Sequence, residues 1–114
     1  MKALSIKQPG PDLILSGRQT IHVTQRGTTY RGPLLICASA EPPAMHAGCM
    51  ICVVDLTYVD HMEPEDAKPG NHFFHKRLYS WHLVHPRETE HKPAKGVLGL
   101  FEVEDERIEY LTGA

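Results

Sequence analysis

Short apolar runs, separated by turn-forming residues, divide this chain into strand-sized segments. Residues 2–7, 20–25 and 33–39 are runs of this kind, and the run at 50–59 is longer and rich in β-branched residues. Apolar runs of this length between Gly, Pro and polar clusters are typical of strands. The continuous run at 33–39 has no polar alternation, so we expect that strand to be buried on both faces.

The second half of the chain predicts two more strands. The segment 78–84 has the composition of a strand, and Pro86 should end it because proline restricts the residue before it. In 96–104 the second half alternates, which places Phe101 and Val103 inward and Glu102 and Glu104 outward. Acidic residues, prolines and Gly70 make 60–76 a long excursion between strands, and 40–48 and 91–95 are expected to be loops.

Only residues 10–16 have the pattern of a short helix, which Gly17 would end in a left-handed turn. The predicted fold class is therefore α+β and mainly β. Its five or six strands and one or two short helices fit a small β-barrel, because closure removes exposed sheet edges.

The length of 114 residues predicts a single domain, 1–114, and the apolar fraction of 41% is that of an ordinary folded chain. No apolar run approaches the roughly 20 residues of a membrane span, and no signal-peptide pattern opens the chain. The three cysteines suit reduced thiols better than a disulfide framework. We therefore expect a cytoplasmic protein that does not engage a membrane.

The net charge of −2 is distributed unevenly along the chain. Residues 1–40 and 68–95 are basic, and the second of these segments also carries five histidines. Residues 41–67 and 96–114 are acidic. If the basic segments meet in space, the protein presents a basic face to an anionic partner; otherwise the charges are simply solvated.

Neither the cysteines nor the eight histidines have the spacing of a metal site. Cys49 and Cys52 lie at the start of a predicted strand, where side chains three apart point to opposite faces, and His82 and His85 fail the same test. His72 and His75 would share a face only on a helix, without an obvious third ligand. We predict buried thiols, no metal and no cofactor.

Trp81 is the only tryptophan and shares one face of its predicted strand with Tyr79. These rings can stack on a nucleobase, or they can fill the centre of a small barrel. Lys7 and Gln8 close the first strand directly before the helix, a position where folds often gather binding groups.

Several segments taken in order resemble the ASCH domain, a branch of the PUA-like superfamily. They are S-I-K-Q-P, L-I-L-S-G, Y-R-G-P-L-L-I-C-A-S, V-V-D-L, Y-S-W-H-L-V-H-P-R and K-G-V-L-G-L-F-E-V, which together span about residues 2–104. The resemblance implies a PUA-like β-barrel with a cleft beside a short helix. It also implies binding of nucleic acid or nucleoside ligands, and some ASCH domains are amidohydrolases acting on N4-acetylcytidine or ribonucleases.

The chain departs from the ASCH pattern at positions that line the family's cleft. Gly10 stands in place of an aromatic residue, and Gln19 in place of a lysine. His22 occupies the position of an acid or a catalytic threonine, and Thr24 that of an arginine; Cys37 replaces a histidine. A glutamine cannot exchange the proton that such a lysine would, so catalysis is in doubt while the scaffold is retained.

The sequence thus predicts an ASCH-domain protein that binds RNA or a nucleotide or nucleoside in a cleft. Lys7, Gln8, Arg31 and Ser39 are expected near its floor, His22 and Trp81 on its walls, and Arg18, Arg26, Lys76, Arg77, Arg87 and Lys95 around its rim. One alternative is a hydrolase on a modified nucleoside or RNA, with His22 as the catalytic base. A second is a protein-interaction module of transcription-related complexes that uses the acidic segments.

Overall fold

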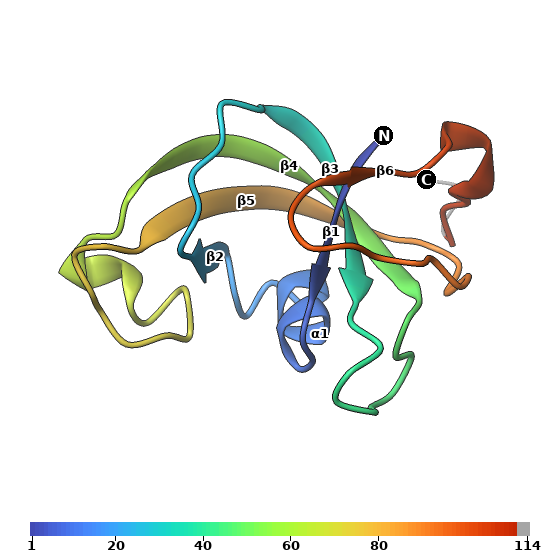
Figure 1. Ribbon diagram of the computed structural model, residues 1–114, viewed down its shortest axis with the longest axis horizontal. Coiled ribbons are helices and arrows are strands. Elements are labelled where there is room, and N and C mark those ends of the chain that lie inside the picture. The colour runs from blue at the N-terminus through green and yellow to red at the C-terminus, as the bar shows by residue number, and fades with distance from the viewer. Residues whose placement is uncertain (112–114) are drawn as a thin grey trace.

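The computed structural model describes residues 1–111 and contains six strands and one α-helix (Figure 1). The strands are β1 (Lys2–Ile6), β2 (Ile21–Thr24), β3 (Gly32–Ala38), β4 (Met50–His61), β5 (Tyr79–Glu88) and β6 (Phe101–Glu102). Helix α1 is Gly10–Leu15, and two 3-10 turns are η1 (Pro64–Asp66) and η2 (Asp105–Arg107). The mainly β fold class predicted from the sequence is confirmed.

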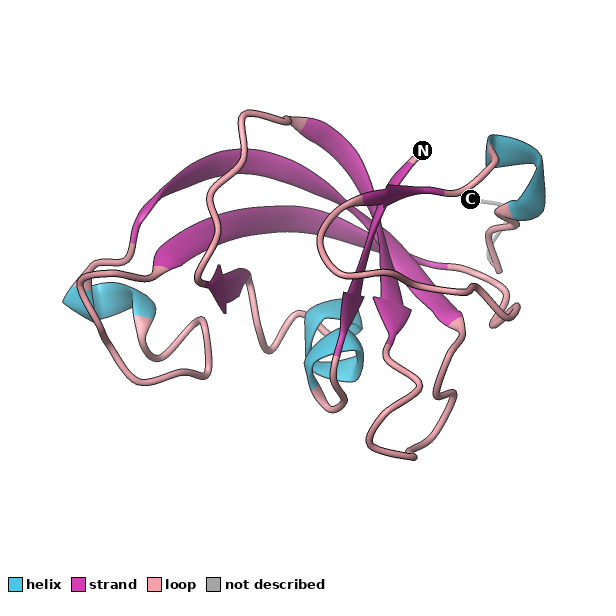
Figure 2. Ribbon diagram, viewed as in Figure 1, coloured by secondary structure: helices cyan, strands magenta, loops and turns pink. Residues whose placement is uncertain are grey.

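All six strands form one sheet in the order β2-β5-β4-β3-β1-β6. The pair β1 and β3 is parallel, and the other pairs are antiparallel. The sheet curls into a half-barrel with α1 on its concave side (Figure 2). At one end β2 has a partner only in β5, and at the other end β6 pairs only with Lys2 and Ala3 of β1. Most of β1 therefore has no strand on its outer side.

The two central strands carry apolar residues on both faces, and both faces are covered. On the concave side Leu34 and Ile36 pack with Ile14 of α1 and with Trp81. On the convex side Leu35 packs with a second cluster formed by Ala3, Cys37, Met50, Val53, Ala94, Val103 and Ile108. The expectation that 33–39 is buried on both faces is confirmed.

Helix α1 is short; it packs against β3, β4 and β5, and its first residue lies close to the end of β1. A Cβ atom on Gly10 would lie 2.8 Å from Cγ2 of Ile6, so this position has no room for a larger side chain at the present spacing. Gly17 follows the helix with φ of 80°, the left-handed turn predicted from the sequence. Gly10, which stands where the ASCH pattern has an aromatic residue, thus lies in close contact with the end of β1.

Two strand predictions are wrong in part. Pro86 does not end β5, because His85 adopts a φ of 59° and the extra residues form a bulge opposite Val54, after which pairing with β4 resumes. The predicted strand 96–104 shrinks to Phe101–Glu102, and the residues before it form a loop in which Gly99 has a φ of 81°. The inward side chain of Val103 and the outward Glu102 are confirmed.

The three cysteines are free thiols, as predicted. Cys37 and Cys52 are buried, and burial raises the pKa of each to about 12. Cys49 is half-buried, just before β4. The prediction of buried thiols therefore holds for two of the three.

Candidate ligand-binding cleft

A cavity of about 610 Å³, here called the seam cavity, lies between β1 and β2 where the curled sheet stays open. Residues 4–7 of β1 and its end form one wall, and residues 22–24 of β2 form the other. Trp81 of β5 and the loop segments 26–28 and 98–100 complete it, together with His72. The cavity exists because β6 covers only the first residues of β1 and no strand bridges β1 to β2.

The polar groups of the seam cavity are neutral or basic. Lys7 and Arg26 are exposed at its border, and the guanidinium of Arg26 lies beside Gly99. Thr24 and Thr28 add hydroxyl groups. Within the described residues, no Asp or Glu lines this cavity. A cavity of this composition favours an anionic ligand over a cationic one.

Trp81 both fills the core and borders the cavity. Its side chain is only 3% exposed, and its indole N–H donates a hydrogen bond of 2.9 Å to the carbonyl oxygen of Arg26. The His22 ring stands edge-on to Trp81 with the ring centroids 5.8 Å apart. At this exposure Trp81 belongs to the core, and stacking of this ring on a nucleobase stays a prediction.

His22 is held in its neutral form. Burial lowers the pKa of His22 to about 4, and the nearby His72 lowers it further in the same direction. At neutral pH the imidazole therefore offers one donor and one acceptor nitrogen toward its surroundings. A group with this pKa is a weak proton acceptor at pH 7.

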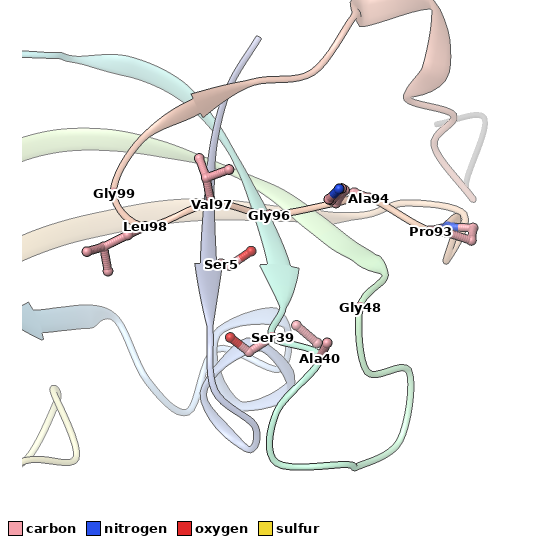
Figure 3. A pocket seen from close by; sticks show the side chains of 12 residues that line it. Ser5, Ser39, Ala40, Gly48, Pro93, Ala94, Gly96, Val97, Leu98 and Gly99 are labelled. Atoms are coloured by element: carbon pink, nitrogen blue, oxygen red, sulfur yellow. The ribbon is translucent and has the colours of Figure 1, made fainter.

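A second cavity of about 560 Å³, here called the serine cavity, adjoins the first and holds Ser39 (Figure 3). Ser39 lies there with Ser5 and Lys95, and the segment from Pro93 to Gly99 crosses β1 close to Ser5. The approach is tight, because a Cβ atom on Gly96 would overlap the Ser5 hydroxyl. The two cavities share Ser5, Leu98 and Gly99.

The structure brings Lys7, His22 and Trp81 together, with Ser39 in the adjoining cavity. Among the residues that line the two cavities, Gln8, Arg18, Arg31 and Arg87 do not appear. Arg18 is exposed directly after Gly17, and Arg31 donates to the carbonyl oxygens of Thr28 and Tyr30 at 2.9 and 2.8 Å.

Gln8 and Arg87 make structural contacts instead. The Gln8 amide donates to the carbonyl oxygen of Met45 at 3.1 Å, which joins the loop 40–48 to the start of α1. Arg87 forms a two-pronged ion pair with Asp55, at 3.0 and 3.2 Å, and thereby lowers the pKa of Asp55. Arg18, Arg31, Gln8 and Arg87 thus stand apart from the convergent set.

Gln19, at the position of the family's lysine, is also a structural residue. Its side chain is buried, and its amide donates to the carbonyl oxygen of Ile21 at 2.9 Å. It does not line the seam cavity. Gln19 therefore supplies an internal hydrogen bond and no cleft group.

Sequence reasoning missed Ser5 and His72 as cavity residues. Ser5 carried a usable signal, because it lies two residues before Lys7 and shares its face of the strand. His72 carried none, since only the path of the excursion between β4 and β5 brings it to β2. Arg26, expected at the rim, does border the cavity.

Two features are absent from residues 1–111. No three His, Cys, Asp or Glu side chains in this range gather closely enough to hold a metal ion. No helix in the same range is long and apolar enough to cross a membrane.

Comparison with known proteins finds similarity in structure rather than in sequence. No protein-family model matches the chain, and no curated protein does. The crystal structure of ASCH from Zymomonas mobilis superposes with a TM-score of 0.69 at 11% identity, covering 92% of this chain and 88% of that one. Two mutant structures of the same ASCH protein match with TM-scores of 0.68 and 0.67. The chain thus has the fold of the ASCH structures, as the resemblance in its sequence indicates.

Proposed function

We propose that this protein binds a nucleotide unit, free or within RNA, in the seam cavity. One observation carries the proposal. Lys7, His22 and Trp81 come from three different strands or strand ends, and they line one cavity that no carboxylate of the described residues borders. The Zymomonas ASCH structures support the fold beneath the site and not its ligand.

The dimensions and chemistry of the cavity suit such a ligand. Its volume of about 610 Å³ lies within the range of roughly 300–1,000 Å³ that is usual for small-molecule sites. Lys7 and Arg26 supply positive charge for a phosphate. The His22 ring, which stands edge-on to the nearly buried Trp81, offers aromatic surface for a base, and its neutral imidazole can pair with the edge of the base.

The hydrolase alternative has less support. It needs a proton acceptor that is effective near neutral pH, whereas the pKa of His22 is lowered to about 4. Gln19 gives no replacement for the missing lysine, because its amide is buried and hydrogen-bonded to the backbone. Binding without turnover is the simpler use of this set of residues.

Binding can be tested with uridine and adenosine 5′-monophosphates, followed by NMR shifts and by the fluorescence of Trp81. We expect Lys7→Ala to weaken binding about tenfold, the loss of one charge-assisted hydrogen bond to phosphate. Lys68→Ala is the matched control, because Lys68 is an exposed lysine that does not line the cavity. Its binding should equal that of the unmodified protein.

Binding that is absent at low salt, or equal for Lys7→Ala and the unmodified protein, would refute the proposal. Turnover of N4-acetylcytidine or labelled RNA that His22→Ala abolishes would favour the hydrolase instead. A protein captured through the acidic segments, with no nucleotide bound, would favour the interaction module.

A further inference from the structure

The seam cavity has a second neighbour, which shares no lining residue with the serine cavity. This third space, here called the loop cavity, measures about 590 Å³ and lies between β2 and the excursion that joins β4 to β5. Phe73, His75 and Arg77 of the excursion line it. It shares Val23, Thr24 and His72 with the seam cavity. The three cavities therefore form a row, with the seam cavity in the middle.

The row is free of negative charge over its whole length. The chain contains fourteen Asp and Glu residues, and among residues 1–111 not one of them lines any of the three cavities. Each cavity has at least one fixed cation: Arg77 in the loop cavity, Lys7 and Arg26 in the seam cavity, and Lys95 in the serine cavity. In a protein of net charge −2 this segregation produces a basic track on an acidic molecule.

The flanking cavities also carry groups that suit a nucleic-acid chain. Phe73 is 70% exposed, so its ring can stack on a base. In the serine cavity the hydroxyls of Ser5 and Ser39 can donate to sugar or phosphate oxygens. The volume of each of the three cavities lies within the range that is usual for small-molecule sites.

We infer that the three cavities are consecutive subsites for a single-stranded oligonucleotide, with about one nucleotide in each. This inference rests on the proposed function, since it assigns the central nucleotide to the seam cavity. It adds a ligand length and two flanking subsites. The bases of a duplex are stacked and paired, so they could not enter three separate cavities; the bases of a single strand could.

A length series tests the inference: uridine 5′-monophosphate and oligouridylates of two to six nucleotides, measured by calorimetry at two salt concentrations. We expect affinity to rise about tenfold with each nucleotide up to the third, within the range of base stacking, and little thereafter. The slope of log K against log salt should steepen by about 0.7 for each added phosphate that is bound.

Variants of the flanks sharpen the test. Arg77→Ala and Lys95→Ala should each weaken the trinucleotide about tenfold while leaving the mononucleotide unchanged, and Lys68→Ala should change neither. Equal affinity for the mononucleotide and the trinucleotide, or flank variants without effect on the trinucleotide, would overturn the inference and leave the proposed function standing. If no length binds at all, the proposed function fails together with it.

Discussion

The half-barrel has a closed side, formed by β3 and β4, and an open side, formed by β1 and β2, and the two differ in strand pairing and in burial. On the closed side, β3 pairs with residues 50–56 of β4, and residues 34–37 and 50–53 are fully buried. On the open side, β1 and β2 have no strand between them, β2 alternates buried and half-buried residues, and Lys7 is exposed. Stability is thus concentrated in buried residues of β3 and β4 that do not line the seam cavity. Lys7 and His22 lie on or beside strands, β1 and β2, whose edges at the seam are unpaired.

The largest expected effect breaks the closed side. Leu35 is fully buried, and its replacement in Leu35→Ala should lower the free energy of unfolding by about 2–5 kcal/mol, through lost burial and the cavity left behind. Leu98→Ala is the matched change on the open side, where the leucine is 85% exposed, and should cost less than about 0.5 kcal/mol. Urea denaturation measures both; similar losses for the two variants would contradict the contrast.

An intermediate effect is expected from His22 at the border between the two sides. The folded-state pKa of about 4 lies below the unfolded value of 6.5, so the unfolded chain binds more protons between these values. The contribution of the neutral His22 ring to the free energy of unfolding is therefore fully present above pH 6.5 and is lost as the pH falls toward 4. We expect this loss to be about 1–3 kcal/mol, since part of the ring borders water.

His22→Phe isolates that contribution, because it removes this imidazole and keeps the other seven histidines in both proteins. The difference in unfolding free energy between His22→Phe and the unmodified protein should change between pH 6.5 and pH 4 and stay level from pH 7 to pH 8. A difference that is flat over the whole range would show that His22 is solvated.

The smallest expected effect concerns Lys7. Its side chain is exposed, so Lys7→Ala should alter the free energy of unfolding by less than about 0.5 kcal/mol. Thermal denaturation checks this. A variant that loses nucleotide binding at unchanged stability would place Lys7 in the open side's function alone, whereas a large loss of stability would mean that the two sides are not separate.

The sequence predicts the closed side better than the open one, for a physical reason. Burial on both faces leaves a continuous apolar run, and that pattern identifies β3 directly. The bulge at His85 depends on the partner strand and has no local signal in the sequence. The sequence therefore predicts an end of β5 before Pro86, whereas the strand continues to Glu88. The seam cavity likewise depends on tertiary structure, because it forms where no strand joins β1 to β2. Lys7, His22 and Trp81 converge on it, whereas Arg31 donates a hydrogen bond to the carbonyl oxygen of Thr28.

The resemblance to the ASCH pattern likewise predicts the strands better than the cavities. It indicates the fold, which residues far apart in sequence establish together. It does not predict that the excursion brings His72 to β2, because loop paths vary where strands do not. The serine and loop cavities are formed largely by such connecting segments.

Because two of the three thiols are buried, only Cys49 is left for selective chemical labelling. Thiol reagents attack the thiolate, and Cys37 and Cys52 are both inaccessible and protonated at neutral pH, since their pKa values are near 12. Cys49 is half-buried and directly follows Gly48, which lines the serine cavity. A maleimide dye would therefore attach to the folded protein at a single natural position, at the edge of the basic track, without the removal of any other cysteine.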